Sequence, residues 1–279
     1  MTHVWANGVL LESDAVRISP FDHGLLVGDG VFETIRVYDG RPFAWRRHLD
    51  RLAHSAVGLG LTVPDRADLR AAADAVLRAN QLGEARLRIT ITGGLAPLGS
   101  ERGESPPTVI VAATDVRAHP ATADVVVVPW VRNERSAVAG LKTISYAENV
   151  RALAYAHERG AGEAVFANTR GELCEATGSN VFLVRDHGIV TPPEESGCLL
   201  GVTRALVLEL CSDLGIDCAE QTLPVVALMQ ADEAFLTSTV REVQPVTAVD
   251  GRALTRAPGA ITRQLAAAFT DLVARDLDP

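Results

Sequence analysis

Hydrophobic and polar side chains alternate with a period of two along parts of the first third of the chain. In residues 31–38 the two aromatic side chains, Thr34 and Arg36 fall on one face, and the aliphatic side chains and Glu33 fall on the other. Residues 86–92 repeat the pattern, with arginine and threonine opposite leucine and isoleucine. The dipeptide Asn7-Gly8 is typical of a tight hairpin turn. These patterns predict β-strands that each present one polar face.

Elsewhere the spacing of apolar residues and the local composition predict helices and further short strands. Helices are predicted near residues 46–59, 66–81, 146–159, 205–214 and 258–275, and strands near residues 42–45, 108–113, 125–128, 163–168, 172–175, 179–185 and 233–236. The polar stretch Thr114–Asp124 has the composition of a linker. We therefore expect two α+β domains, residues 1–118 and residues 119–279, with a cleft between them.

The bulk composition excludes several classes of protein. The chain has 279 residues, of which 47% are hydrophobic and 22% charged, as in an ordinary soluble globular protein. Its formal net charge of −9 argues against nucleic-acid binding, and no apolar run approaches the ~18 residues that a membrane span needs. The N-terminus lacks a signal-peptide pattern, and the cysteines show no metal-binding spacing. We expect a cytoplasmic protein with reduced cysteines and no metal site.

Candidate chemistry begins at Lys142, which lies in the stretch 136–145 without any other ionisable side chain. A lysine in apolar surroundings loses hydration of its ammonium group, and this favours the neutral, nucleophilic amine. A Schiff-base lysine requires that property, although many such lysines instead extend their amine to water. Lys142 alone therefore leaves both interpretations open.

Later segments carry groups that a pyridoxal phosphate cofactor needs. Glu175 ends a short predicted strand before a glycine turn, and a carboxylate there can hold the protonated ring nitrogen that makes this cofactor an electron sink. The segment 201–203 leads into a predicted helix, whose free N–H groups suit a phosphate. The segment 237–239, Thr-Ser-Thr, adds hydroxyl groups after another strand. Taken singly, each is also typical of a solvated glutamate, a helix start or a polar turn.

The order of these segments resembles that of the fold-type IV pyridoxal-phosphate enzymes, which include branched-chain aminotransferases, D-amino acid aminotransferases and aminodeoxychorismate lyases. The resemblance rests on Lys142 and on residues 175–180, 201–203 and 237–245, and residues 28–36 and 48–52 extend it over nearly the whole chain. It implies an α+β fold with a smaller N-terminal α/β sandwich domain and a larger C-terminal pseudo-barrel domain that binds the cofactor. It also implies an active site in the cleft between the domains, and a homodimer.

The resemblance implies roles for individual residues as well. Lys142 would form the Schiff base and move a proton, Glu175 would hold the pyridine nitrogen, and Arg51 would pair with the phosphate. Arg135 would support the glutamate. Tyr146 would donate to the phenolic oxygen, although it lies one position nearer to the lysine than the matching tyrosine of branched-chain enzymes. The other cofactor-binding residues that the resemblance implies are Asn180, Leu199, Val202, Thr203, Ser238 and Thr239.

The residues that are expected to contact the substrate distinguish among the activities of this family. D-amino acid aminotransferases of the well-known bacterial type carry an Arg-x-His carboxylate trap where this chain has Leu98-Gly99-Ser100. Branched-chain enzymes have glycine at the position of Thr34, two residues after an aromatic residue that corresponds to Phe32. We expect Arg88, or else Arg36, to bind a substrate carboxylate in place of the trap. The substrate contacts expected together are Phe32, Thr34, Arg36, Arg88 and Leu98.

The resemblance therefore implies an aminotransferase that uses pyridoxal 5'-phosphate to move an amino group between an α-amino acid, preferably a D-amino acid, and an α-keto acid. Aminodeoxychorismate lyase, which forms 4-aminobenzoate and pyruvate in folate synthesis, is the main alternative, because residues 33–36 and 142–149 look closer to the lyase-like and noncanonical D-specific branches. A branched-chain L-amino acid aminotransferase is a second alternative. A cofactor-binding protein without turnover is disfavoured, because the lysine, the glutamate and the phosphate-binding residues are all present.

Overall fold

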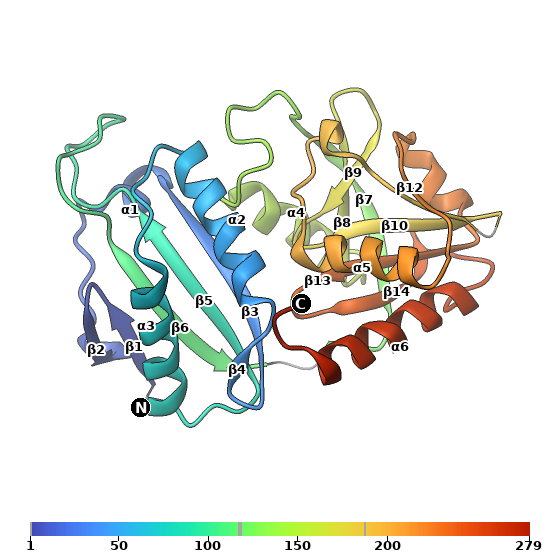
Figure 1. Cartoon of the computed structure of the whole chain (residues 1–279). Helices are drawn as coiled ribbons and strands as arrows, with labels where there is room; N and C mark the ends of the chain where they lie inside the picture. The colour runs from blue at the N-terminus through green and yellow to red at the C-terminus, as the bar shows by residue number, and fades with distance from the viewer. Residues whose placement is uncertain (1, 117–118, 187) are drawn as a thin grey trace. The chain divides into compact units, whose positions relative to one another are not determined.

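The computed structural model describes residues 2–116, 119–186 and 188–279, and these form two compact units (Figure 1). One unit comprises Met1–Arg117, Leu141–Tyr146 and Leu277–Pro279, and the other comprises Ala118–Gly140 and Ala147–Asp276. The segment that carries Lys142 thus groups with the N-terminal part of the chain, which a division into residues 1–118 and 119–279 does not describe. Part of the predicted linker, residues 117–118, lies outside the described residues. No described helix is long and apolar enough to cross a membrane.

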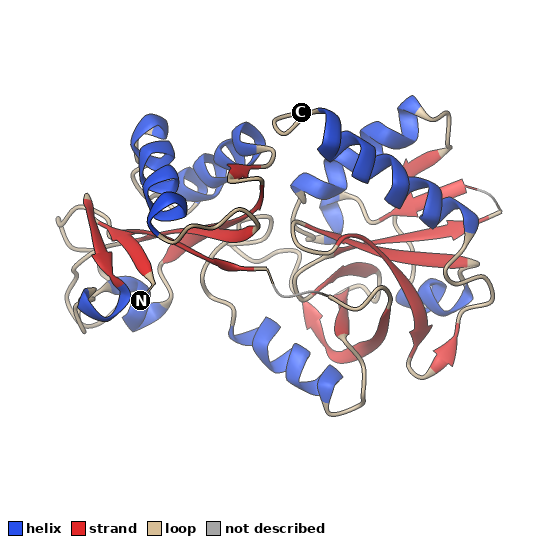
Figure 2. Ribbon diagram, turned by 90° about the horizontal axis from the view of Figure 1, so that it is seen from below, coloured by secondary structure: helices blue, strands red, loops and turns tan. Residues whose placement is uncertain are grey.

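The first unit is an antiparallel sheet with helices against one face (Figure 1, Figure 2). Its elements are β1 (His3–Ala6), β2 (Val9–Glu12), η1 (Ser13–Ala15), α1 (His23–Val27), β3 (Gly30–Tyr38), β4 (Arg41–Pro42), α2 (Trp45–Gly58), α3 (Arg66–Ala79), β5 (Ala85–Thr92) and β6 (Val109–Asp115). The strand order is β2-β1-β6-β5-β3-β4. Asn7 and Gly8, with φ values of 47° and 95°, form the predicted hairpin turn between β1 and β2.

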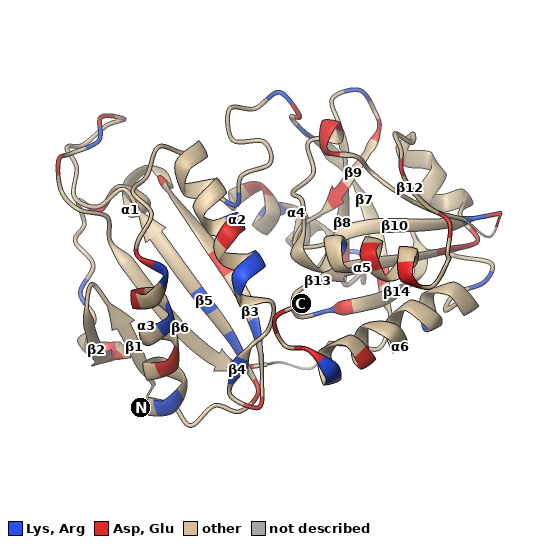
Figure 3. Cartoon of the chain, viewed as in Figure 1, with Lys and Arg blue, Asp and Glu red and all other residues tan. Residues whose placement is uncertain are grey.

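The predicted alternation of residues 31–38 and 86–92 is confirmed in β3 and β5, which pair in antiparallel register. The aliphatic face of both strands packs against the apolar stripes of α2 and α3 and forms the core of this unit. The basic positions of both strands, which Figure 3 marks along the ribbon, alternate with these aliphatic residues and therefore belong to the opposite face. The candidate substrate contacts of these two strands therefore lie on the face that the two helices do not cover.

The second unit is built on a long, curved, mixed sheet (Figure 2). Its elements are β7 (Ala123–Arg132), α4 (Ala147–His157), β8 (Glu163–Asn168), β9 (Leu173–Ala176), β10 (Asn180–Arg185), β11 (Gly188–Thr191), η2 (Glu194–Ser196), α5 (Val202–Asp213), β12 (Cys218–Glu220), η3 (Val225–Gln230), β13 (Glu233–Ser238), β14 (Glu242–Val249), β15 (Arg252–Ala253) and α6 (Ala260–Arg275). The strand order is β12-β11-β10-β13-β14-β7-β8-β9, and β15 pairs with β14.

The predicted α+β class is confirmed, and most predicted helices lie within a few residues of the observed bounds, whereas strand β14 is absent from the prediction. In β14, Pro245 pairs in register with Phe235 of β13. Proline has no N–H to donate to a ladder and is rare inside strands, so its presence hides this strand from a reading based on composition. Strand β14 lies between β13 and β7. It therefore joins the strands that carry residues 180 and 237 to those that carry residues 132 and 175 in one sheet.

Candidate active site

The backbone of Lys142 in the first unit is held from two sides. Its N–H donates to Ser55 Oγ on α2 at 3.0 Å, and its carbonyl oxygen accepts from the N–H of Phe32 on β3, also at 3.0 Å. Two residues on, the N–H of Ile144 donates to the carbonyl oxygen of Gly30 at 2.9 Å. The lysine segment thus runs beside the start of β3, and its backbone position is fixed by the helix and the strand together.

The amine of Lys142 lies among aromatic rings. Its Nζ is 4.4 Å from the ring centroid of Phe32 and 5.8 Å from that of Tyr146, and the two rings meet edge to face at 5.1 Å. Lys142 is also the single lysine in the whole sequence, where every other strongly basic side chain is an arginine. This composition is a signal that the motif-based reading missed. It means that Lys142 is the one side chain of the protein that can form a Schiff base.

Arg88 of β5 stacks on the same ring. Its guanidinium carbon lies 3.7 Å from the Phe32 ring centroid, and its Nε donates to Thr90 Oγ1 at 3.1 Å. Burial, and then the neighbouring charge of Arg86, lower the pKa of Arg88. Among the described residues no carboxylate forms an ion pair with Arg88. A half-buried cation without an anion, opposite Thr34 in register, is suited to bind a carboxylate from outside the chain.

The other two candidate substrate contacts are placed differently. Arg36, four residues beyond Phe32 along β3, forms an ion pair with Glu84 and lies 4.8 Å from the ring centroid of Tyr38. Leu98 lies on the loop between β5 and β6 and is 73% exposed. The structure therefore brings Phe32, Arg88, Lys142 and Tyr146 together and leaves Arg36 engaged elsewhere, which makes Arg88 the better candidate for a carboxylate ligand.

Arg51 belongs to a buried charge cluster on the helix-facing side of β3. Its Nε and Nη2 donate to the Glu33 carboxylate at 2.7 and 2.8 Å, and His48 Nδ1 donates to the same carboxylate at 2.7 Å. Burial raises the pKa of Glu33, but the charge of Arg51 and the hydrogen bonds from both partners outweigh burial and hold it well below its usual range. Burial, opposed in part by Glu33, lowers the pKa of His48. His48 is therefore neutral near pH 7, and two hydrogen bonds to Glu33 hold the Arg51 guanidinium in place.

In the second unit, Glu175 is tied to the segment that leads into α5. Its Oε2 accepts from the N–H of Leu199 at 3.0 Å, and the Asn180 side-chain amide donates to the Leu199 carbonyl oxygen at 2.7 Å. A Cβ at Gly201 would lie 2.1 Å from Asn180 Oδ1, so only glycine permits this approach. The predicted acid and the predicted helix start are thus connected through Leu199 and Asn180.

The start of α5 fits a phosphate group. Its N-cap residue, Gly201, supplies no side-chain cap, so the first N–H groups of the helix at Val202 and Thr203 have no intrahelical acceptor. Thr237 pairs in register with Asn180, and its buried Oγ1 has no hydrogen-bond partner among the described residues. Thr237 is thus paired with the asparagine that approaches Gly201, and its buried hydroxyl and the uncapped helix start are both groups that can donate to a phosphate. Thr237 belongs to the hydroxyl-bearing segment 237–239 expected from the sequence, in which only Ser238 and Thr239 were expected to bind the cofactor.

One expectation for this unit is corrected. The arginine nearest to Glu175 is Arg132, whose Nε lies 3.4 Å from Glu175 Oε1, and not Arg135. Strand β7 ends at Arg132, whose guanidinium carbon lies 4.4 Å from the ring centroid of Phe166 on the neighbouring strand. Arg135 follows in the turn beyond the strand, with a side chain 82% exposed and 3.8 Å from Glu134. Strand β7 extends to residue 132, beyond the predicted end at residue 128. Arg132, the last residue of β7, therefore supports Glu175.

A family model for class IV amino-transferases matches residues 30–249 of this chain. The chain belongs to the class IV aminotransferases. The match covers Lys142, Glu175 and the start of α5, and it confirms the fold-type IV resemblance seen in the sequence. Enzymes of this class use pyridoxal 5'-phosphate, and the fit of α5, Thr237 and Glu175 to that group agrees with this.

Curated relatives of this aminotransferase carry different activities in their names. A protein of Methanocaldococcus jannaschii, provisionally named a branched-chain-amino-acid aminotransferase, is 34% identical over 96% of each chain. The D-alanine aminotransferase of Bacillus licheniformis is 31% identical, over 96% of this chain and 95% of its own. The aminodeoxychorismate lyase of Bacillus subtilis is also 31% identical, over 88% of this chain and 86% of its own.

Solved structures agree with the family over the whole length. The branched-chain aminotransferase of Thermoproteus uzoniensis with norvaline superposes with a TM-score of 0.91 at 31% identity, covering 98% of this chain and 94% of that one. A T.th. branched-chain amino acid aminotransferase with pyridoxamine 5'-phosphate gives a TM-score of 0.91 at 28% identity and the same coverage. The fold-type IV architecture and the pyridoxal 5'-phosphate cofactor are therefore confirmed for this aminotransferase.

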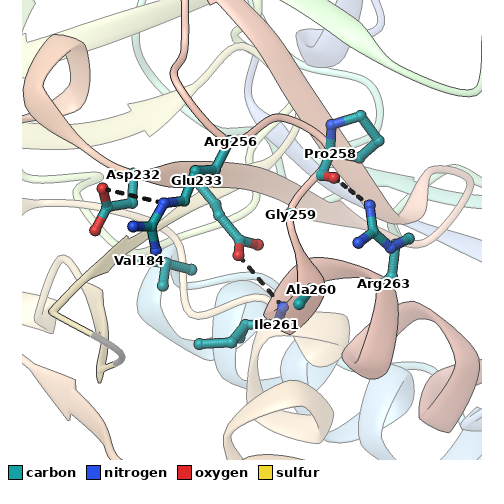
Figure 4. Close-up of a pocket in the computed structure, with 9 residues that line it drawn as sticks. All are labelled: Val184, Asp232, Glu233, Arg256, Pro258, Gly259, Ala260, Ile261 and Arg263. Carbon is teal, nitrogen blue, oxygen red and sulfur yellow. Dashed lines mark hydrogen bonds and ion pairs between the residues drawn. The ribbon is translucent and has the colours of Figure 1, made fainter.

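A pocket of about 400 Å³ in the second unit lies apart from the predicted site residues (Figure 4). It opens at the start of α6, where the Glu233 carboxylate accepts from the N–H of Thr262 at 2.9 Å and from its hydroxyl at 2.7 Å. Figure 4 shows Arg256 directed toward Asp232 and Arg263 toward Pro258. Because Glu233 already caps the helix, this pocket offers no anion site, and we assign it no role in the reaction.

His23, at the start of α1, has an acceptor at both ring nitrogens. Its Nδ1 lies 2.8 Å from Asp29 Oδ2, and its Nε2 lies 3.0 Å from the carbonyl oxygen of Gly99. Neutral imidazole carries one N–H, so both hydrogen bonds form only when the ring is protonated. The hydrogen bond with Asp29 raises the pKa of His23 against the lowering effects of burial and of Arg102. Protonated His23 therefore holds the tip of the β5–β6 loop in place through its hydrogen bond to the carbonyl oxygen of Gly99.

We expect this hydrogen bond to weaken as pH rises. Since the folded-state pKa of His23 lies above its ordinary value of 6.5, the stabilisation is complete below pH 6.5 and is lost as pH rises through the folded-state pKa. Amide exchange of residues 98–101, corrected for the intrinsic rate, should accelerate roughly fivefold over that interval, for one lost hydrogen bond. In a His23→Gln variant exchange should be fast at every pH, while the exposed control His157→Gln should follow the wild type. Corrected wild-type exchange that stays constant with pH would contradict this.

Proposed function

We propose that this aminotransferase moves an amino group between an α-amino acid, with D-amino acids favoured, and an α-keto acid. The observation that carries the proposal is the stacking of Arg88 and the amine of Lys142 on the one ring of Phe32, at 3.7 and 4.4 Å from its centroid. A small α-amino acid carries a carboxylate and an amino group one carbon apart. Arg88 can bind the carboxylate while Lys142 acts at the α-carbon.

Each residue of the proposed site has a separate role. Bound pyridoxal 5'-phosphate supplies an electron sink for the α-carbon. Lys142 would hold it covalently and would take the proton from the substrate's α-carbon. Glu175, supported by Arg132, would hold the protonated pyridine nitrogen. The start of α5 would bind the phosphate, and we propose Arg51 as a further phosphate ligand. Supporting contacts are proposed for Tyr146, Asn180, Leu199, Val202, Thr203, Ser238 and Thr239, with Thr237 added by the structure.

The proposed D-amino acid preference rests on the face of β3 and β5. Thr34 lies opposite Arg88 in register and is buried, so its side chain fills space that the glycine of branched-chain enzymes would leave open. Less room beside the carboxylate ligand disfavours branched L-amino acid side chains. The chain also lacks the Arg-x-His trap at residues 98–100, so Arg88 is the carboxylate ligand that the proposal requires.

Arg88→Ala tests that ligand. Loss of a carboxylate–guanidinium contact in a site shielded from water should cost on the order of 2–3 kcal/mol, which corresponds to a roughly 30- to 150-fold rise in the Michaelis constants for both the amino acid and the keto acid. Arg86→Ala is the matched control, because Arg86 lies two residues away on the same strand face but is exposed. Steady-state kinetics that leave both Michaelis constants unchanged in Arg88→Ala would sink this assignment.

Lyase chemistry is the second candidate, because residues 33–36 and 142–149 resemble the lyase-like branch as well as the noncanonical D-specific branch. A transaminase and a lyase both begin with removal of a proton from the substrate by Lys142, and they part afterwards. Absorbance spectra separate them: with D-alanine the cofactor band should convert to that of the aminated cofactor, and 2-oxoglutarate should restore it. If neither D- nor L-amino acids change the spectrum while aminodeoxychorismate yields pyruvate, the lyase is the function. Conversion with L-leucine alone would favour the branched-chain alternative.

We also propose that the enzyme is a cytoplasmic homodimer. Exposed apolar side chains in the first unit support self-association: Phe21 is 51% exposed, Leu25 67% and Leu95 48%. Their segments lie side by side, because the N–H of Ala96 donates to the carbonyl oxygen of Phe21 at 3.1 Å. Such a patch is unusual on a monomer. Analytical ultracentrifugation should give twice the chain mass of 29.6 kDa, and a monomer at micromolar concentration would contradict the proposal.

A further inference from the structure

Two small residues on α2 form the surface against which the lysine segment lies. Ser55 is fully buried, and its Oγ accepts from the Lys142 N–H at 3.0 Å. Gly58, one helical turn further, has no side chain where Leu141 packs: a Cβ there would lie 2.7 Å from Leu141 Cδ2 and 3.1 Å from Cδ1. Residues three apart share a helix face, so Ser55 and Gly58 meet two consecutive residues of the segment.

The lysine segment depends on these contacts because it is not part of a regular strand. Thr143 forms only an isolated bridge to Val31, and the N–H of Lys142 points away from the β3 backbone toward the helix. A buried N–H without an acceptor is costly, so the segment is held where Ser55 can reach it. The side chain of Lys142 then leaves a backbone that is fixed on both sides and reaches the ring of Phe32.

We propose that Ser55 and Gly58 are positioning residues for the Schiff-base lysine: the hydroxyl fixes the Lys142 backbone, and the missing side chain at Gly58 lets Leu141 settle beside it. The inference rests on the proposed role of Lys142. It assigns to α2 a role beyond the His48 and Arg51 side chains that this helix contributes to the charge cluster at Glu33. Small errors in the position of an acid–base group reduce the rate more than they reduce binding.

Two variants disturb this surface in opposite ways. Ser55→Ala removes the acceptor, and Gly58→Ala adds a methyl group that displaces Leu141 while favouring the helix. In the cofactor-free protein, amide exchange of residues 141–146 should become roughly tenfold faster in Ser55→Ala. Because Lys142 is the single lysine, the rate of its modification by an amine reagent, followed by peptide mass spectrometry as a function of pH, reports its environment directly. In both variants, the dependence of the Lys142 modification rate on pH should differ from that of the wild type.

In the loaded enzyme, both variants should lower kcat about tenfold and change the Michaelis constants less than twofold. Gly58→Ala should do so with a melting temperature equal to or above that of the wild type, so the loss cannot come from unfolding. Val57→Ala, on the exposed side of α2, should match the wild type throughout. The inference is overturned if Gly58→Ala keeps the wild-type kcat and modification profile, or if Val57→Ala reproduces the effects. The proposed function fails separately, if Lys142→Ala still binds the cofactor covalently.

Discussion

Lys142→Ala is expected to abolish transamination, with a fall in turnover of roughly four orders of magnitude or more. The variant loses both the covalent anchor of the cofactor and the group that moves the proton, and removal of a residue with two such roles usually leaves only residual catalysis. No other side chain can replace it, since the sequence contains no second lysine. The Schiff-base absorption band should disappear while cofactor bound through its phosphate and ring nitrogen remains detectable.

Two measurements make this result specific. Borohydride reduction of the wild-type enzyme should add the cofactor to a single peptide, the one that contains Lys142. Lys142→Arg should keep the positive charge beside Phe32 yet remain as inactive as Lys142→Ala, because guanidinium neither forms the Schiff base nor gives up its proton near neutral pH. A visible Schiff-base band in either variant, or reduction that labels the N-terminal amine instead, would remove Lys142 from the mechanism.

The sequence could predict the strands and the main chemical groups because those depend on local order. The alternation in β3 and β5 separates a polar face from a core face, and Glu175 and the start of α5 can be located from their neighbours along the chain. The contacts between these groups depend on where the strands end. Arg132 approaches Glu175 because β7 runs to that residue, and a motif read by spacing selected Arg135 instead.

The register of Thr237 and the partners of Glu33 could not be derived from the sequence, for a related reason. Thr237 differs from Ser238 and Thr239 only by its register with Asn180, which the order of residues does not reveal. Glu33 lies on the aliphatic face of β3, where a carboxylate is stable only because α2 places His48 and Arg51 over it. Tertiary pairing, not local pattern, decides which of these polar residues is functional or structural.

Glu33→Gln is expected to lower the free energy of unfolding of the first unit by about 3 kcal/mol or more. Glu33 is fully buried and the Arg51 side chain is 12% exposed, so the neutral amide leaves a buried guanidinium without its counter-charge. Urea denaturation followed by tryptophan fluorescence in a Trp130→Phe background, which leaves only Trp5 and Trp45 of the first unit, would measure the loss. Glu84→Gln, which removes the partner of Arg36 from a position 54% exposed, is the control and should cost less than about 1 kcal/mol.

The pH dependence of the same comparison identifies the cause. The pKa of Glu33 is depressed in the folded state, so its contribution is complete above the ordinary value of 4.5 and is lost as pH falls toward the folded-state pKa. The difference in unfolding free energy between wild type and Glu33→Gln should therefore shrink steadily below about pH 4.5. A difference that stays constant with pH would mean that glutamine is merely a poor fit for the space, and the ion pair with Arg51 would then not be what stabilises this part of the fold.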